Sequence, residues 1–189
     1  MKESFIVEIS LNFNNIIHDV FVELEDGGIT TLDEVLEKVK ETVCESIKPQ
    51  DLPQLMLDLD PEEDPEDVDI EDYITITEEM CTFNMKGLPY FAKEMGWSEI
   101  ETFLEEYYKS HNDLDVFESA YELGISFESV DDCYRGKWNS DEEFAEELVT
   151  SLGELPDNIP SYIVIDWEAT ASNLMYDYSE YDGHYFNNY

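Results

Sequence analysis

The sequence contains very little positive charge. Of its 189 residues, nine are Lys or Arg and 48 are Asp or Glu, so the formal net charge is −39. Residues 138–189 hold twelve carboxylates and no Lys or Arg at all. Nucleic acids and anionic lipid surfaces repel such a chain. The charge balance therefore argues against direct binding of nucleic acid or membrane, and it favours a positively charged partner.

Long hydrophobic runs and cysteines are also scarce. No stretch approaches the roughly 20 apolar residues that a membrane-spanning helix needs. The first thirteen residues interrupt their apolar run with acidic and polar residues, unlike a secretory signal. The three cysteines, Cys44, Cys81 and Cys133, are odd in number and far apart, which is typical of reduced thiols. We therefore expect a cytoplasmic protein.

The sequence lacks the spacings that mark common catalytic and metal sites. His18, His111 and His184 lie far apart and form no zinc-binding pattern. There is no Gly-rich phosphate loop and no nucleophile-elbow motif. A glycosidase needs two carboxylates, but among 48 no pair is distinguished. We expect no catalytic residue, no cofactor and no metal.

One acidic run stands out from the rest of the chain. Residues 58–72 contain ten carboxylates and no Lys or Arg. A solvated loop is the simplest interpretation. A calcium loop is another, because acids alternate over residues 58–64, but Glu63 occupies the position that needs Gly, and Pro61 and Pro65 restrict the backbone. We therefore do not predict a calcium site.

Despite its charge, the chain has enough apolar residues to fold. Hydrophobic residues make up 42% and aromatic residues 13% of the sequence, more than is typical of disordered segments. Adaptation to high salt would also give an acidic surface. That interpretation is disfavoured here because eight of the nine cations are Lys, the residue that a halophile sheds first.

Alternating apolar and polar residues predict three strands in the first third of the chain. These strands are residues 5–13, 18–24 and 54–60. Residues 32–47 instead show helical spacing, with Thr31 and Glu34 as a capping box. We predict that residues 1–78 form a small sheet with one packed helix and an acidic loop.

Helical spacing dominates the middle of the chain. We predict a short helix at 88–96, a helix through Lys109 that opens with a Ser98–Glu101 capping box, and a helix that ends at Gly124. A further short helix begins near Ser126. Residues 79–132 are thus predicted to form a helical bundle.

The last third mixes helices with extended segments. Residues 133–138 are predicted to be extended, and two helices follow that Ser140 and Asp166 cap. Asp182-Gly183 suits a type I′ hairpin turn. We predict a mixed domain at residues 133–189. The predicted fold class is α+β, an elongated chain of three small subdomains.

The net negative charge of the chain can be compared with the charge density of duplex DNA. Duplex DNA carries about one negative charge per 1.7 Å of axis, so a net charge of −39 corresponds to roughly 65 Å of duplex. A compact chain of this length spans only about 40 Å. To match the charge density of DNA, the molecule has to be elongated or to pair with a copy of itself.

Several carboxylates recur three or four residues apart on predicted helices, where side chains are about 5–6 Å apart. This spacing is close to that of successive phosphates. Repeated like charges disfavour a helix slightly, so their recurrence indicates a role in binding. The predicted phosphate-mimicking acids are Asp58, Asp60, Glu62, Glu63, Asp64, Glu66, Asp67, Asp69, Glu71, Asp72, Glu101, Glu105, Asp115, Glu118, Glu142, Glu146 and Asp177.

The carboxy-terminal half resembles the ArdA antirestriction family. The similarity is carried by "YRGKWNSDEEFAEELVTSLGELPDNIPSYIVIDWEATASNLMYDYSEYDGHYF", residues 134–186, in which Gly136, Ser140, Phe144 and Ala145 begin a helix. Helical similarity extends back to about residue 98. The segment "LNFNNIIHDVFVEL" does not reproduce the glycine-containing opening motifs of the family.

The resemblance implies a function and an assembly. ArdA-type proteins are elongated dimers that imitate bent DNA and occupy the DNA-binding groove of Type I restriction-modification enzymes. Phages, plasmids and transposons encode them, and they act in the bacterial cytoplasm. Their dimer contact lies in the carboxy-terminal domain, which implies an interface at Ile163, Ile165 and Trp167, although each is also consistent with ordinary core.

Two other classes of function remain open from the sequence. An acidic adaptor or inhibitor would bind another basic protein, such as a CRISPR effector or a histone-like protein, without competing with duplex DNA. An enzyme would place one carboxylate with a strongly raised pKa in a pocket.

Overall fold

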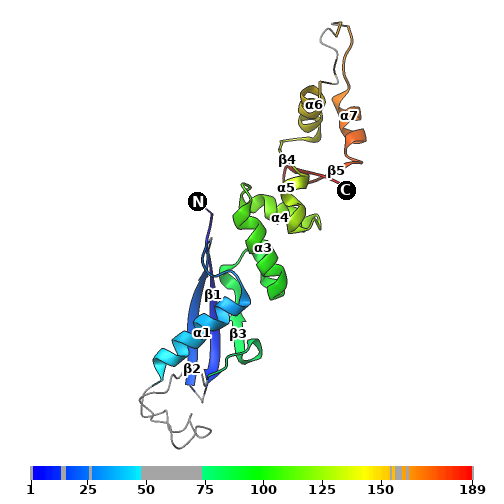
Figure 1. The fold of residues 1–189 in the computed structure, drawn as a ribbon. Helices are drawn as coiled ribbons and strands as arrows, with labels where there is room; N and C mark the ends of the chain where they lie inside the picture. Colours follow the sequence, from blue (N-terminus) through cyan, green and yellow to red (C-terminus); the bar gives the residue numbers. More distant parts are fainter. Residues whose placement is uncertain are drawn as a thin grey trace, which may run out of the picture. The chain divides into compact units, whose positions relative to one another are not determined.

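The structure is a computed structural model that describes residues 2–13, 16–25, 27–47, 74–153, 155, 159–160 and 162–188. The chain forms two compact units, Met1–Glu105 and Glu106–Tyr189. Each unit contains a three-stranded antiparallel sheet together with helices (Figure 1). The predicted α+β class is confirmed. The finer division into three subdomains and the elongated form stay predictions.

The first sheet has the strand order β2-β1-β3. β1 (Phe5–Phe13) pairs with β2 (Ile16–Leu24), which confirms the first two predicted strands. The predicted strand at 54–60 lies outside the described residues. β3 (Cys81–Asn84) pairs with the other side of β1, although we assigned this segment to the helical bundle. Four residues are too few to show a period, and pairing with β1 decides their conformation.

The helix α1 (Leu32–Ser46) packs on this sheet and begins at the predicted capping box. The Thr31 hydroxyl accepts a hydrogen bond from the Glu34 N–H, and the Glu34 carboxylate accepts one from the Thr31 N–H at 3.0 Å. The buried residues Val35, Val39 and Val43 of α1 share the core with the inward side chains of the sheet. These are Phe5, Val7, Ile9, Leu11, Val20, Val22 and Leu24.

Three short 3-10 turns surround β3 and lead to the next helix. They are η2 (Glu78–Met80), η3 (Met85–Gly87) and η4 (Tyr90–Glu94). Gly87 lies so close to β1 that a Cβ atom there would be 1.9 Å from the backbone oxygen of Ile6. Glycine is therefore required for η3 to pack against the sheet.

The helix α3 (Trp97–Lys109) ends where we predicted. The predicted Ser98–Glu101 capping box is wrong, because the helix begins before Ser98. The Gly96 N–H donates instead to the Glu99 carboxylate at 3.1 Å. Ser98 precedes Glu101 by three residues and Gly96 precedes Glu99 by three residues, so both spacings fit a helix start. Packing of Trp97 into the core selects the earlier start. The residues Ile100, Phe103, Leu104 and Tyr107 of α3 are all buried.

The second unit begins with short helices. α4 (Leu114–Glu122) is followed by Gly124 with a positive φ of 71°, as a helix-terminating glycine requires. A 3-10 turn, η5 (Phe127–Ser129), then leads into α5 (Val130–Cys133). Val116, Phe117 and Ala120 of α4 are buried, whereas Tyr121 is exposed.

A second sheet has the order β4-β6-β5. It consists of β4 (Tyr134–Lys137), β5 (Tyr178–Tyr181) and β6 (His184–Asn187). The predicted hairpin joins β5 to β6, and both Asp182 and Gly183 have positive φ, 49° and 80°. These values match a type I′ turn.

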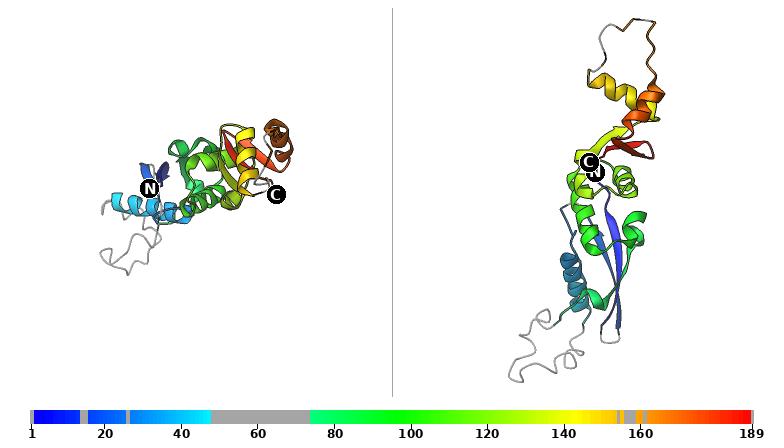
Figure 2. Two further views of the ribbon diagram at one scale, coloured as in Figure 1. Left: turned by 90° about the horizontal axis from the view of Figure 1, so that it is seen from above. Right: turned by 90° about the vertical axis from the view of Figure 1, so that its right-hand side faces the viewer.

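Two helices, α6 (Asp141–Ser151) and α7 (Trp167–Leu174), pack side by side (Figure 2). The Ser140 hydroxyl and the Asp166 carboxylate cap them as predicted. The Phe144 ring of α6 is buried and stacks on Tyr185, with ring centroids 4.4 Å apart. Leu152 follows the last residue of α6 and is 62% exposed.

Among the described residues, no helix has both the length and the apolar character needed to cross a lipid bilayer.

Candidate functional site

The acidic surface of the second unit has few cations to balance it. Residues 106–189 contain twenty Asp and Glu but only three Lys and Arg. Lys109 contacts Glu106 at 3.4 Å, and Arg135 donates to the backbone oxygen of Asp132 at 3.0 Å. Lys137 contacts Asp115 at 3.8 Å and Asp182 at 3.9 Å. The cations thus have contacts within the unit, and most of its carboxylates are left uncompensated.

The helix α6 holds five carboxylates, all of them exposed. Three accept hydrogen bonds from neutral donors: Asp141 from the Tyr185 hydroxyl, Glu143 from Asn139, and Glu147 from the Trp138 indole. Neutral donors orient these carboxylates without cancelling their charge.

The predicted acids of α6 are Glu142 and Glu146. Hydrogen bonds from the backbone and from the Ser140 hydroxyl lower the pKa of Glu142 below its usual value, so it is ionised at neutral pH. Within the part of the chain that the structure describes, Glu146 makes no hydrogen bond or ion pair. Both side chains are therefore available to a cationic partner.

The predicted pair on α3 has a different environment. Glu101 is half-buried, and its carboxylate accepts a hydrogen bond from the Leu32 N–H at 2.6 Å. Leu32 is the first residue of α1, where an anion is favoured by the helix dipole. Glu105, one turn further along α3, is exposed. Glu101 thus has a structural contact that the sequence did not reveal.

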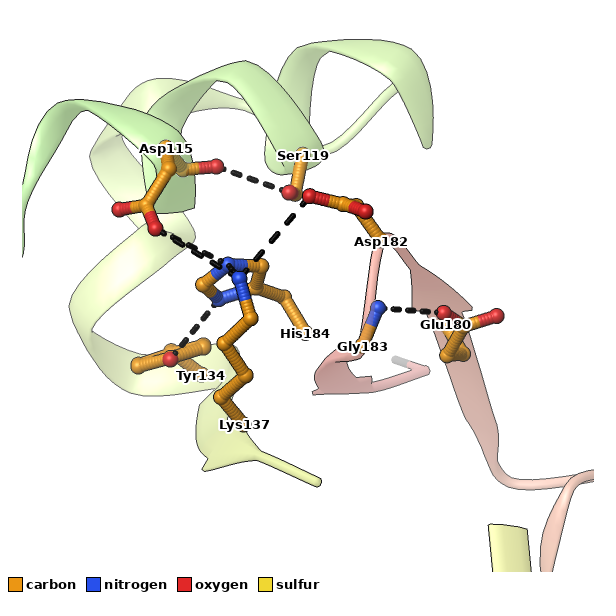
Figure 3. A network of polar contacts seen from close by, with 8 residues as sticks. All are labelled: Asp115, Ser119, Tyr134, Lys137, Glu180, Asp182, Gly183 and His184. Atoms are coloured by element: carbon orange, nitrogen blue, oxygen red, sulfur yellow. Dashed lines mark hydrogen bonds and ion pairs between the residues drawn. The ribbon is translucent and has the colours of Figure 1, made fainter. Parts of the chain in front are cut away.

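The predicted pair on α4 borders a network of titratable side chains (Figure 3). Glu118 is half-buried and Asp115 is exposed. The Asp115 carboxylate lies 3.3 Å from Nε2 of His184 and 3.8 Å from the Lys137 ammonium. The hydroxyl of Ser119 donates to the backbone oxygen of Asp115 at 2.8 Å. The ion pair between Asp115 and Lys137 therefore links α4 to β4 of the second sheet.

His184 lies at the centre of this network and is buried. Its Nε2 is 3.0 Å from the Lys137 ammonium, and its Nδ1 is 3.0 Å from the Tyr134 hydroxyl. An ammonium only donates, so Nε2 accepts and Nδ1 carries the proton. Burial, and then the charge of Lys137, lower the pKa of His184. The imidazole is therefore neutral near pH 7, and its contact with Asp115 is not an ion pair.

The remaining predicted acids are less informative. Asp177 is exposed, and its backbone oxygen accepts a hydrogen bond from the Asn188 N–H at 2.8 Å. The predicted acids at residues 58–72 lie outside the described residues.

The predicted dimer residues lie in and beside an exposed apolar segment. Ile163 is 52% exposed, whereas Ile165 and Trp167 are half-buried. Their neighbours Tyr162 and Val164, in the same segment, are 84% and 88% exposed. Neither a helix face nor an alternating strand buries four consecutive apolar residues, so part of this segment is exposed.

Sequence reasoning also missed acids on the first sheet. Glu8, Asp19 and Glu23 occupy outward positions of β1 and β2, opposite in parity to the buried residues. The alternation of the two strands was sufficient to identify them.

The described residues contain no group of three or more His, Cys, Asp or Glu side chains that is arranged to hold a metal ion. Among the described residues, Cys44, Cys81 and Cys133 form no disulfide bond, and burial raises the pKa of Cys81 and Cys133.

No family model matches the chain, and the searches found no similar curated protein and no similar solved structure.

Proposed function

We propose that this protein is a DNA mimic that occupies the DNA-binding groove of a Type I restriction-modification enzyme and inhibits it. Its carboxylates take the place of DNA phosphates and pair with Lys and Arg of the enzyme. The proposed setting is the cytoplasm of a bacterial host that carries a phage or another mobile element.

The observation that carries this proposal is that the few cations of the second unit contact groups within that unit and leave most of its carboxylates uncompensated. In the second unit Lys109, Arg135 and Lys137 all contact groups of the same unit, while α6 and α4 each carry exposed acids. A surface of this kind attracts a basic groove over a long range and speeds association with it.

The spacing of the helical acids supports the same function. Six of the predicted phosphate-mimicking acids lie on helices of the structure, two each on α3, α4 and α6. Side chains three or four residues apart on a helix are about 5–6 Å from each other, close to the phosphate spacing along a strand. The resemblance of residues 134–186 to ArdA-type proteins agrees with this arrangement.

We further propose that the protein acts as a homodimer through the apolar segment that contains Ile163. A contiguous exposed apolar segment is typical of a protein interface. Dimerisation would double the charge available to one enzyme groove.

The experiment is a competition assay. Labelled duplex DNA is bound to a purified Type I restriction-modification enzyme, and the protein is titrated in. We expect displacement of the duplex, with an apparent affinity that falls steeply as salt is added. Binding to the enzyme without displacement of DNA would contradict mimicry and would favour the adaptor.

Variants test how the charge is distributed. Glu142→Gln or Glu146→Gln alone should change inhibition by only a few fold, because many contacts share the binding energy. Neutralising Glu118, Glu142, Glu146 and Asp177 together should abolish it. The matched control replaces Glu142 and Glu146 by Asp, which keeps the charge and should keep inhibition. Loss of inhibition through one of the single substitutions, in a folded protein, would contradict the proposal.

A further inference from the structure

The outward face of the first sheet carries exposed apolar side chains among its polar ones. The inward residues of β1 and β2 are buried in the core. Among the outward residues, Ile6, Ile17 and Phe21 are 52%, 70% and 65% exposed. An antiparallel sheet with one solvated face normally carries polar residues there. We call the outward residues Ile6, Glu8, Ile17, Asp19, Phe21 and Glu23 the open face.

The strand register mixes apolar and acidic side chains on the open face. Ile6 is opposite Glu23, and Glu8 is opposite Phe21. Ile6 and Phe21 are therefore diagonal neighbours, close enough for a long or aromatic side chain to bridge. Along β2, Ile17, Asp19, Phe21 and Glu23 alternate between apolar and acidic. The open face thus offers apolar contact and negative charge at adjacent positions.

Each carboxylate of the open face is held in place by a neutral donor. The Ser4 hydroxyl donates to Glu23 at 2.5 Å, and the Ser10 hydroxyl donates to Asp19 at 2.6 Å. The Asn84 amide donates to Glu8 at 2.6 Å. Within the described residues, none of the three carboxylates forms an ion pair with Lys or Arg. They therefore keep their charge in a fixed orientation.

We propose that the open face is a docking surface for a protein segment in which Lys or Arg alternates with aliphatic residues. Charge complementarity selects this occupant. A second copy of the chain would bring its own Glu8, Asp19 and Glu23 against the same three carboxylates of this face. A cationic segment instead pairs with the acids, while its aliphatic side chains cover Ile6, Ile17 and Phe21.

This surface adds an apolar contact to the electrostatic binding proposed above, and it does not depend on which enzyme is the target. Salt screens the exposed charge pairs but leaves burial of apolar surface largely intact. Binding at the open face should therefore retain selectivity for aliphatic residues at physiological salt.

Two labelled peptides test the proposal with the full-length protein. One is a dodecapeptide of alternating Lys and Val, and the other is a dodecapeptide of alternating Lys and Ser with the same charge. At 150 mM NaCl, fluorescence anisotropy should show the Lys-Val peptide binding at least about tenfold tighter, as expected for a few buried aliphatic side chains. Equal affinities would overturn the proposal.

Substitutions locate the binding. Ile17→Ser with Phe21→Ser should reduce binding of the Lys-Val peptide to the level of the Lys-Ser peptide. The matched control is Leu152→Ser with Tyr176→Ser, which removes comparably exposed apolar side chains from the second unit, outside the proposed dimer segment, and should leave peptide binding unchanged. Unchanged binding by the open-face variant, or equal loss in the control, would overturn the proposal.

Two further measurements complete the test. In the wild-type protein, the amide resonances of Ile6, Ile17 and Phe21 should shift when the Lys-Val peptide is added, and unmoved resonances would count against the open face even if the variant did not fold. Analytical ultracentrifugation tests the second copy. A dimer that the open-face variant dissociates and the control does not would assign the face to self-association and overturn the proposal.

Discussion

The buried imidazole of His184 shows how a single residue joins distant parts of the second unit. It contacts Tyr134 and Lys137 of β4 and lies beside Asp115 of α4. Burial and the neighbouring ammonium favour the neutral ring, whereas Asp115 and Asp182 oppose them more weakly. The network therefore depends on His184 remaining uncharged.

Replacing His184 should change the pH dependence of stability. Its pKa in the folded state is lowered from an ordinary value of 6.5, so in the unfolded chain the ring binds its proton more readily. The stability that the neutral ring provides is complete above about pH 6.5 and is lost as the pH falls towards the lowered pKa. His184→Gln should cost about 1–3 kcal/mol at pH 7 through lost hydrogen bonds.

Urea unfolding between pH 7.5 and 5 checks this. The free energy of unfolding of the wild type should fall over that range by more than that of His184→Gln. The matched control replaces the exposed His111 by Gln. Parallel pH profiles for the wild type and the His184 variant would contradict a lowered pKa.

At the scale of secondary-structure elements, acids of this chain have two different roles. Some stabilise helix starts, as Glu34 does in the capping box of α1 and Glu101 does from α3 towards Leu32. Others, such as Glu146 on α6, are exposed and make no hydrogen bond or ion pair within the described residues. Such acids only add repulsion to the folded state, which is consistent with a role in binding.

Two matched substitutions separate these roles. Glu101→Gln should lower the free energy of unfolding by about 0.5–1 kcal/mol, because it removes a negative charge from the first turn of α1. Glu146→Gln, on a surface without cations, should be neutral or slightly stabilising. Thermal denaturation of both variants gives the comparison. A larger loss for Glu146→Gln than for Glu101→Gln would contradict the assignment.

At the scale of the whole molecule, the net charge of −39 opposes folding through self-repulsion. The core that resists it is aromatic and aliphatic, with Phe103 against Phe91 in the first unit and Phe144 against Tyr185 in the second. Both cores are built from apolar side chains, so they do not require salt to form.

Salt should therefore stabilise the fold without being needed for it. Raising NaCl from 10 to 150 mM shortens the Debye length from about 30 Å to about 8 Å, which weakens the repulsion between exposed carboxylates. We expect Tm to rise by several degrees, and circular dichroism to show a folded protein already at 10 mM. Unfolding at low salt would instead indicate adaptation to a saline environment.

The sequence by itself determined the features that depend on neighbours along the chain. The capping box of Thr31 and Glu34, the cap at Asp166 and the type I′ turn at Asp182-Gly183 were all predictable. Each rests on hydrogen bonds or backbone preferences within a few residues. The acidic character of the candidate site followed from composition in the same way.

Only the tertiary structure decided which side chains meet across the fold. Pairing of β3 with β1, the contact of Glu101 with α1 and the burial of His184 all involve residues far apart in sequence. Such contacts depend on how helices and sheets pack, because only packing brings distant residues together. Local sequence patterns carry no record of that packing.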